Sequence, residues 1–508
     1  MKITILTVIL ASLVFAEWPQ FKRTADRQGC DASEQITLPS KLCCWVDFGS
    51  PFRASAALVN DKAYAVSGRG LLARIDLATN TVDWHAHLGG VNNESSPAVD
   101  NGKVYVGSTS NKFYVLNAET GAVLKEYVAG GAIFSSPLLF NNSVYFGSAD
   151  GVFHALDLDG NLKWTFQAHK QIIYSAAGDP ATGWIVFTDG HSSMYWLTDG
   201  GAQAQVVREY TNPDSWNMIT YVSSPMFWNS RIYIGKDGSE GGNYNIISYL
   251  AATDSVQDSI KGTPIVHGTP SVDTLLGFVA WPGSYDGLFT RLGASGYWAT
   301  TGWGTPGFGV PGQSYPGVNS SPAVIKNLVI FGSEEDGVHF FRKDSVGTSA
   351  YRANISTGCQ LWKYAPAGCK PIEAGPAVSN GKVVVGSFDG CLYGFWDGAE
   401  VTSPALADSL STEYRQSAAL PGKWILTAFP NPASAGRVNL ELAGLKEMAT
   451  IAIYSVSGAL VCILPVQGAI QWDLTDQRNR PVSSGTFYAV VRNAGGKQMM
   501  AFNLQIVR

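Results

Sequence analysis

Charged residues are scarce in this sequence: Asp, Glu, Lys and Arg make up 15% of the 508 residues, and the net charge is -5. The basic residues are interspersed with acidic ones and form no stripe that would replace counterions on a phosphate backbone, so nucleic acid is not an expected partner. After residues 1–16, no apolar run reaches the roughly 18 residues of a membrane-spanning helix. We therefore expect no transmembrane segment.

Sequence motifs of common enzyme sites are also missing: we find no Gly-x-Ser-x-Gly elbow, no His-Glu-x-x-His helix and no phosphate-binding loop. What is abundant instead is glycine, with 55 residues, together with 15 Trp and 21 Tyr. This composition is typical of many short strands joined by tight turns. The fold class predicted is all-β.

The N-terminus has the pattern of a secretory signal peptide, with an apolar run from Ile3 to Phe15 that ends in Ala16. Residues 1–16 are therefore expected to be removed, leaving a mature chain that starts at Glu17. This interpretation predicts a secreted protein, located outside the cell or on its outer surface. An oxidising compartment permits disulfides among the seven cysteines, and we expect a possible pair between Cys359 and Cys369.

An internal repeat is the strongest signal in the chain. One unit contains Ser95-Ser96-Pro97, a Val-Tyr-Val-Gly-Ser segment at 104–108 and a third apolar segment at 113–117. A spacing of about 40 to 50 residues with these segments is typical of four-stranded propeller blades. Eight units are found, headed by Ser55, Ser95, Ser135, Ser175, Ser223, Gly268, Ser320 and Ala374. We predict an eight-bladed β-propeller over residues 17–397.

These units resemble the pyrroloquinoline-quinone-like (quinoprotein-type) propeller repeat. The resemblance rests on an Ala-x-Asp-x-x-x-Gly-x-x-x-Trp tail, matched by Ala73, Asp76, Asn80 and Trp84, and on the opening Trp18-Pro19-Gln20-Phe21. It implies that a strand near the N-terminus completes the last blade. The candidate for this closing strand is the segment 44–48.

A different pattern follows a linker at residues 398–422. Residues 423–508 carry Phe429-Pro430-Asn431-Pro432, a Tyr-x-x-x-Gly turn at 454–458 and Ser484-Gly485-Thr486-Phe487-Tyr488, with alternating strands between turns. The segment resembles the C-terminal sorting domain of the type IX secretion system and, equally, the flagellar-hook-capping type of Ig-like module. The resemblance implies a small Ig-like β-sandwich that is read by export machinery or used for attachment; a plain packing module is the alternative.

The repeat alignment also predicts a ring of side chains at the mouth of the propeller axis. Taking the residue three positions before each inner-strand Pro, or its equivalent, gives Ala54, Glu94, Phe134, Tyr174, Val222, His267, Asn319 and Glu373. Among these, Glu94, His267, Asn319 and Glu373 form a polar arc suited to a cation or a small polar ligand. The alternative is that they are solvated side chains. His154 and His339 follow blade turns and are interpreted as structural.

Four longer connections, at 208–222, 236–246, 294–318 and 334–350, are expected on one face of the propeller. Aromatic residues in two of them are candidates to stack on sugars or to anchor a protein partner, and a plug over the tunnel is the alternative. These candidate ligand-binding residues are Trp216, Tyr297, Trp298, Trp303, Phe308 and Tyr315.

The preferred function is non-catalytic: a binding or scaffold module for a protein or polysaccharide, with no catalytic residues assigned and no cofactor expected. The alternative is a dehydrogenase that uses pyrroloquinoline quinone with calcium. Enzymes of that kind often place a vicinal disulfide against the cofactor, but the pair Cys43-Cys44 precedes the first blade, and no calcium ligand set is identifiable. The metal content stays open. A third interpretation is a carbohydrate-active enzyme that uses Glu94 and Glu373.

Overall fold

The computed structural model divides the chain into two compact units, Met1–Ala407 and Asp408–Arg508, and this boundary falls within the predicted linker. The described residues are 17–506, except 39, 191–192, 212–219, 222, 238–245, 251–255, 261–267, 276, 284–286, 293–300, 304–319, 334–336, 343–359, 365–370, 402–424, 430–437, 444–448, 456–459, 467–468, 479, 483–484 and 494–497. Strands and turns, with no helix, make up this described part of the chain.

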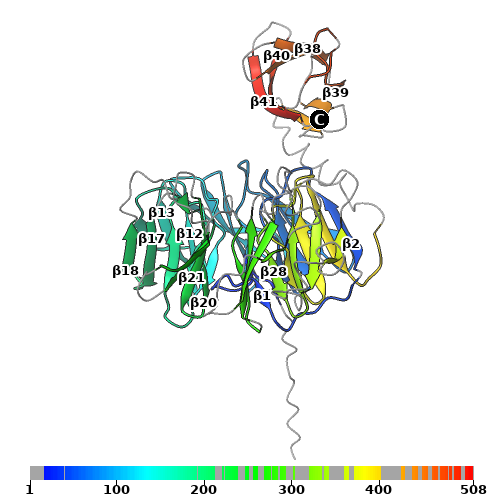
Figure 1. Cartoon of the computed structure of the whole chain (residues 1–508). Helices are drawn as coiled ribbons and strands as arrows, with labels where there is room; N and C mark the ends of the chain where they lie inside the picture. The colour runs from blue at the N-terminus through cyan, green and yellow to red at the C-terminus, as the bar shows by residue number, and fades with distance from the viewer. Residues whose placement is uncertain are drawn as a thin grey trace, which may run out of the picture. The chain divides into compact units, whose positions relative to one another are not determined.

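The strands of the first unit form a series of antiparallel sheets, seen from the side in Figure 1, each built from strands that follow one another along the chain. The first four sheets are β3 (Ala57–Val59), β4 (Lys62–Val66), β5 (Leu71–Asp76) and β6 (Thr81–His87); β7 (Ala98–Asp100), β8 (Lys103–Ser108), β9 (Lys112–Asn117) and β10 (Val123–Val128); β11 (Leu138–Phe140), β12 (Ser143–Gly147), β13 (Val152–Asp157) and β14 (Leu162–Gln167); and β15 (Ala177–Gly178), β16 (Ile185–Thr188), β17 (Ser193–Asp199) and β18 (Ala204–Thr211).

The later sheets follow the same order, except that three further strands join them. They are β20 (Met226–Trp228), β21 (Arg231–Asp237), β22 (Ile246–Leu250) and β23 (Val256–Ile260), with β19 (Thr220–Tyr221) also on β21; β24 (Ser271–Asp273), β25 (Phe278–Gly283), β26 (Gly287–Leu292) and β27 (Thr301–Trp303); β28 (Ala323–Ile325), β29 (Leu328–Gly332), β30 (Val338–Arg342) and β31 (Gln360–Tyr364), with β1 (Cys30–Asp31) parallel to β28; and β32 (Ala377–Ser379), β33 (Lys382–Gly386) and β34 (Cys391–Trp396), with β2 (Lys41–Asp47).

A strand from the N-terminal region completes the last of these sheets, as predicted. Strand β2 pairs antiparallel with β34, so that Trp45 lies opposite Tyr393 and Val46 opposite Leu392. The innermost strand of the same sheet, β32, contacts β3 of the first sheet. The start and the end of the repeat are therefore joined both at the outer edge, by β2, and at the inner edge.

A glycine recurs at the end of the second strand in several units, as in the Val-Tyr-Val-Gly-Ser segment 104–108, and close packing explains it. A Cβ atom on Gly147 would lie 2.1 Å from Ile172 Cγ2, and one on Gly107 would lie 2.3 Å from Ile133 Cγ2. Gly332 and Gly386 are covered in the same way by Ile372 and Phe52. Because each of these apolar side chains comes from the connection that leads to the next inner strand, the glycine allows that connection to pack on the sheet.

The second unit consists of two antiparallel sheets, joined by an edge-to-face contact between Trp472 and Phe487 with ring centroids 6.2 Å apart. One sheet contains β35 (Ile425–Phe429), β36 (Val438–Ala443) and β39 (Ala469–Trp472); the other contains β38 (Leu460–Val466), β37 (Ala449–Ser455), β40 (Gly485–Asn493) and β41 (Gln498–Ile506).

Two of the predicted loops contain strands. Residues Thr301–Trp303 form β27, which pairs with Leu288–Thr290 and is the fourth strand of its sheet, so Trp303 lies in a strand and not in an irregular loop. In the predicted loop 208–222, β18 continues to Thr211, and Thr220–Tyr221 pairs with β21. The sequence analysis assigned these residues to connections between strands, although the third strand of a sheet needs a partner at its outer edge.

Candidate functional site

A polar cavity of about 390 Å³ lies where the inner strands of the first unit converge. Its lining includes residues from nearly every sheet and one aromatic residue from the N-terminal region, Phe21. We call this cavity the axial cup. The described lining residues are Phe21, Arg53, Ser55, Glu94, Ser96, Phe134, Ser136, Ile173, Tyr174, Ser175, Ser224, Thr269, Ser321, Glu373 and Gly375.

Hydroxyl groups at one repeat position join the inner strands into a ring around the cup. The backbone N–H of Ser55 donates to Ser96 Oγ (2.9 Å), and that of Ser96 donates to Ser136 Oγ (3.0 Å). The same bond recurs from Ser136 to Ser175, from Ser175 to Ser224 and from Thr269 to Ser321. A hydroxyl that accepts this N–H still has its own proton to donate. These residues, which we call the hydroxyl ring, thus hold neighbouring sheets together and face the cup with O–H donors.

The eighth position of the ring is Gly375. A Cβ atom there would come within 2.9 Å of the Ser321 carbonyl oxygen and 3.0 Å of Ser55 Oγ. Because the last and first sheets meet at this point, a side chain would collide with both neighbours. Glycine at this position is therefore required for the ring to close.

The mouth of the cup carries a chain of three charged side chains. Arg53 Nη1 lies 2.8 Å from Glu94 Oε1, and Arg53 Nε lies 3.8 Å from Glu373 Oε2. Arg53 also lies over the ring of Phe388, with its Cζ 5.2 Å from the ring centroid. The side chains of Arg53, Glu94 and Glu373 are 42%, 40% and 29% exposed, so the mouth is open to solvent.

The structure brings two members of the predicted polar arc together and corrects the register of the predicted ring. Glu94 and Glu373 line the same cup, whereas His267 and Asn319 lie outside the described residues.

The hydroxyl ring shows that Ser55 is equivalent to Ser96, not to Ser95. The residue at the predicted mouth position in the first sheet is therefore Arg53 and not Ala54. In the fourth sheet it is Ile173 and not Tyr174, although both line the cup. The predicted alignment was wrong by one residue in these two units, which have Ala in place of the inner-strand Pro.

One end of the axis is filled by residues 18–34, which we call the N-terminal segment. It passes the free edges of the inner strands in chain order. Its acceptors receive backbone N–H bonds from Leu58 (to Trp18 O), Val99 (to Pro19 O), Leu139 (to the Gln20 side chain), Gly178 (to Ala25 O), Phe227 (to Asp26 O), Val272 (to Gln28 O) and Val324 (to Gly29 O). Every donor lies three positions after a member of the hydroxyl ring. Glu34 then accepts the N–H groups of Asn380 and Gly381 in the last sheet.

Two fully buried cations of the N-terminal segment bind neutral groups of the inner strands. Arg27 donates to the carbonyl oxygens of Phe21 (2.6 Å), Pro137 (2.9 Å) and Ala176 (2.9 Å). Burial lowers the pKa of Arg27 to about 9, against a smaller opposing effect of Asp26.

Lys22 plays the same part on the other side of the axis. It donates to the carbonyl oxygen of Pro322 (2.8 Å), to that of Thr269 (3.4 Å) and to Ser271 Oγ, and burial holds its pKa well below the usual range. Each of the two cations therefore bridges two neighbouring sheets.

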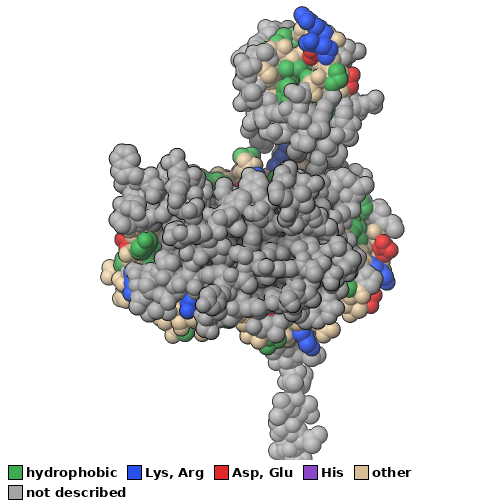
Figure 2. Space-filling view, viewed as in Figure 1, with side chains coloured by type: hydrophobic (Ala, Val, Ile, Leu, Met, Phe, Trp, Pro, Cys, Tyr) green, Lys and Arg blue, Asp and Glu red, His purple; other side chains and the backbone are tan. Residues whose placement is uncertain are grey.

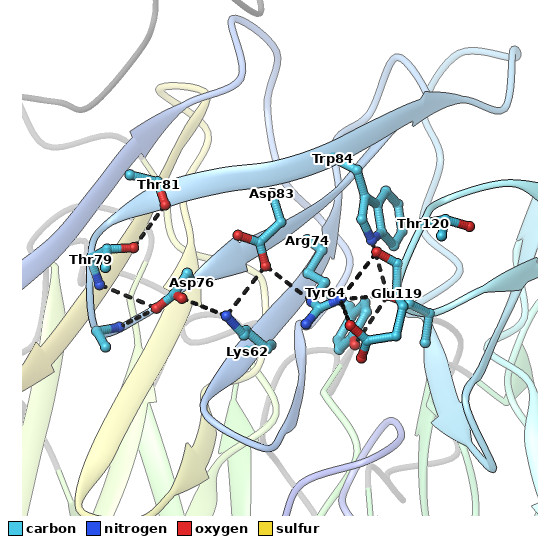
Figure 3. Close-up of polar contacts among 12 residues, drawn as sticks. Lys62, Tyr64, Arg74, Asp76, Thr79, Thr81, Asp83, Trp84, Glu119 and Thr120 are labelled. Atoms are coloured by element: carbon cyan, nitrogen blue, oxygen red, sulfur yellow. Dashed lines mark hydrogen bonds and ion pairs between the residues drawn. The ribbon is translucent and has the colours of Figure 1, made fainter.

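A separate cluster of charges, drawn in Figure 3, links the first sheet to the second. Lys62 lies 3.3 Å from Asp83, and Arg74 lies 3.1 Å from Asp83 and 2.6 Å from Glu119. Trp84 Nε1 donates to the Ala118 carbonyl oxygen across the same boundary (3.0 Å). Because every charge here has an opposite partner, the cluster is a contact between sheets. It gives the Trp of the repeat tail a structural role. Figure 2 likewise shows acidic and basic side chains next to one another on the described edge of this unit.

His154 and His339 are structural, as predicted. His154 Nε2 lies 2.8 Å from Ser148 Oγ, its Nδ1 lies 3.0 Å from the Tyr127 hydroxyl, and its ring stacks on Phe146. His339 is fully buried, lies near Ser333 and stacks on Phe331 in the same way.

Burial lowers the pKa of His154 to about 4, with a smaller opposing effect of Asp150. Above pH 6.5 the imidazole is neutral in both the folded and the unfolded state; as the pH falls from 6.5 to 4, only the unfolded state takes up the proton. Stability is therefore expected to fall over this window, by about 3 kcal/mol at most. His154→Phe should keep the ring stack and remove this dependence of stability on pH.

The measurement is the urea unfolding midpoint at pH 7.5 and 4.5, with His169→Gln as an exposed control. An equal acid-dependent loss in wild type and His154→Phe would contradict the assignment.

Cys43, Cys44, Cys391 and Cys462 are buried and form no disulfide. Cys43 and Cys44 lie in β2, the strand of the last sheet farthest from the axis, and burial raises the pKa of Cys44 to about 12. They are therefore not placed against the axial cup. Cys359 and Cys369 lie outside the described residues, as do Trp216, Tyr297, Trp298, Phe308 and Tyr315.

Among the described residues, no group of three His, Cys, Asp or Glu side chains is arranged to hold a metal ion. The same part of the chain has no helix long and apolar enough to cross a membrane. A second cavity, of about 580 Å³, lies beside Glu17–Gln20 and is lined largely by hairpin-turn residues such as Asn60, Asn101 and Asn141. Several of its asparagines have positive φ, which such turns require.

Comparison with known proteins supports the propeller fold. Residues 68–268 match the family profile described as outer membrane protein assembly factor BamB. No curated protein matches the chain by sequence. Among solved structures, BamB from Moraxella catarrhalis is similar at a TM-score of 0.54 and 13% identity, over 72% of this chain and 99% of that one.

Two dehydrogenases are similar in fold to the same degree. A quinohemoprotein alcohol dehydrogenase from Pseudomonas putida gives a TM-score of 0.57 at 14% identity, over 79% of this chain and 85% of that one. A europium-containing methanol dehydrogenase gives 0.56 at 13% identity, over 75% of this chain and 98% of that one. The first unit is a β-propeller of the pyrroloquinoline-quinone-like type, and at these identities the likeness shows the fold alone.

The described lining of the axial cup does not fit pyrroloquinoline quinone. The cofactor is a polycarboxylic acid, whereas the one described cation of the lining, Arg53, is already paired with Glu94 and Glu373. A polycarboxylate bound here would face two carboxylates and only one guanidinium, so the net electrostatic interaction would be repulsive. The vicinal cysteines, on an outer strand, give no support either.

Proposed function

We propose that this protein is a non-catalytic, eight-bladed propeller, secreted or held at the cell surface, which binds a protein or polysaccharide through the open mouth of the axial cup. The observation that carries the proposal is the mouth itself: its two carboxylates are both engaged by one guanidinium, in a solvent-exposed and strongly polar opening. Such a surface recognises a ligand by hydrogen bonds. Neither carboxylate is placed to act alone as a base.

The likeness to BamB supports a role in assembly or binding, because that family is described as an outer membrane protein assembly factor. We further propose that the second unit is an Ig-like sandwich that serves export or surface attachment, on the strength of its sequence motifs and its two antiparallel sheets.

A quinone-dependent dehydrogenase is the second candidate, favoured by the similarity in fold to two dehydrogenases, one of them a quinohemoprotein. One experiment separates the two functions. The purified chain lacking residues 1–16 is mixed with pyrroloquinoline quinone and calcium, and the absorbance spectrum and dye-linked oxidation of alcohols and sugars are recorded. In parallel, its retention on cell-envelope polysaccharide and protein fractions is measured. We expect retention without turnover. Oxidation of any substrate with bound cofactor, or retention on neither fraction, would overturn the proposal.

A further inference from the structure

The N-terminal segment changes what the propeller axis can bind. An axis lined only by inner strands would be a channel with unpaired backbone edges, through which an extended chain could pass. Here residues 18–34 take up the N–H groups of the inner strands from the first sheet to the seventh. Arg27 and Lys22, both fully buried, fix the segment to carbonyl oxygens on different sides of the axis. The described part of the axis is therefore a blind cup with Phe21 in its lining.

The side chains of the cup suit a neutral ligand with many hydroxyl groups. The hydroxyl ring offers O–H donors, the mouth offers two carboxylates as acceptors and a planar guanidinium as donor, and Phe21, Phe134 and Tyr174 add aromatic side chains to the lining. Sugar hydroxyls both donate and accept, and their C–H faces pack on aromatic rings. The excess of carboxylates disfavours an anionic ligand. The volume, about 390 Å³, lies within the range of about 300 to 1,000 Å³ for small-molecule sites.

The geometry points to the axial cup as a binding site for the terminal residue of a neutral polysaccharide, entering end-on from the mouth that carries Glu94, Arg53 and Glu373. The closed floor supplies the end-on restriction, because a polymer cannot continue past Phe21. This inference rests on the proposed function and names its ligand class. Arg53 is the residue on which it depends most, since it holds both carboxylates in place and can itself donate to neighbouring sugar oxygens.

The test is isothermal titration of the chain lacking residues 1–16 with linear and cyclic neutral oligosaccharides. The probes are maltoheptaose, cellohexaose and N-acetylchitohexaose, with β-cyclodextrin as a glucose oligomer that has no end. We expect at least one linear probe to bind, β-cyclodextrin not to bind, and Arg53→Ala and Glu94→Gln each to weaken the binding at least tenfold.

Lys112→Ala and Glu126→Gln are the matched controls. Lys112 and Glu126 form an ion pair of 2.7 Å with 39% and 43% exposed side chains, close to the 42% and 40% of Arg53 and Glu94, but on β9 and β10, away from the cup. Binding that is equal for cyclic and linear probes, or that is unchanged in Arg53→Ala, would overturn the cup assignment while leaving the proposed function intact. Binding of no linear probe would overturn the ligand class. If the wild-type protein is retained on no envelope fraction, the proposed function itself is overturned.

Discussion

Replacing Arg27 by alanine is expected to lower the free energy of unfolding of the first unit by about 3 kcal/mol or more. The guanidinium is fully buried, and its bonds to Phe21, Pro137 and Ala176 tie the N-terminal segment to the third and fourth sheets. The substitution leaves three carbonyl oxygens without this donor and opens a cavity beside Phe21. We expect a lower urea unfolding midpoint and faster proteolysis of the N-terminal segment.

Two further variants make the Arg27 result specific. Arg27→Lys keeps the charge but loses the planar fork, so it should fall between wild type and Arg27→Ala. Lys170→Ala removes an exposed cation and should change stability by less than about 0.5 kcal/mol. An Arg27→Ala protein as stable as Lys170→Ala would mean that the N-terminal segment adds little to the fold, and the blind cup would lose its structural basis.

The repeat made the inner architecture predictable because one side-chain position recurs with one physical role. Ser96, Ser136 and Ser224 follow the same pattern in sequence, and the structure places them in the same hydrogen-bonded ring. The closing strand β2 was predictable from the resemblance to quinoprotein-type propellers, which implies that a strand near the N-terminus completes the last sheet, and the pairing of β2 with β34 confirms it.

Arg53 and the N-terminal segment were missed for different physical reasons. Arg53 was displaced by one position because Ala56 stands where most units have Pro, and alanine gives no marker of register. The N-terminal segment has no repeat and no periodicity, since much of its binding is through backbone groups to strands far along the chain, as the Gly29 carbonyl oxygen accepts the N–H of Val324. In the sequence, the opening Trp18-Pro19-Gln20-Phe21 marked its start, but nothing indicated that residues 22–34 bind along the axis.

Replacing Asp199 by alanine is the second substitution with a large expected effect, a loss of about 2 to 4 kcal/mol. Asp199 lies at the end of β17, and its side chain is 12% exposed. It accepts hydrogen bonds from Tyr145 (2.8 Å) and Trp164 Nε1 (2.8 Å) of the preceding sheet and pairs with Lys163. Removing the carboxylate leaves the Tyr145 hydroxyl and Trp164 Nε1 without this acceptor at a largely buried boundary, while Lys163 keeps its hydrogen bond to Ser143 Oγ (2.8 Å).

The pH dependence of this contact has a defined sign. Burial alone would raise the pKa of Asp199, but hydrogen bonds from Lys163, Trp164 and Tyr145 outweigh it and hold the pKa below its ordinary value. A carboxylate with a depressed pKa stabilises the fold fully above the unfolded value of about 3.9, and this stabilisation is lost as the pH falls below it. The gap in unfolding midpoint between wild type and Asp199→Ala should therefore be constant from pH 5 to 8 and narrow towards pH 3.

The chain carries its own control for this effect one boundary earlier. Asp159 pairs with Lys103 across the second and third sheets at 2.5 Å, but its side chain is 76% exposed, so Asp159→Ala is expected to cost less than about 1 kcal/mol. The two carboxylates make ion pairs at equivalent boundaries, and they differ in burial and in the Tyr and Trp donors that Asp199 collects. Similar losses for Asp159→Ala and Asp199→Ala would show that charge pairing holds the sheets together. A loss confined to Asp199→Ala would assign that role to the buried hydrogen-bond network.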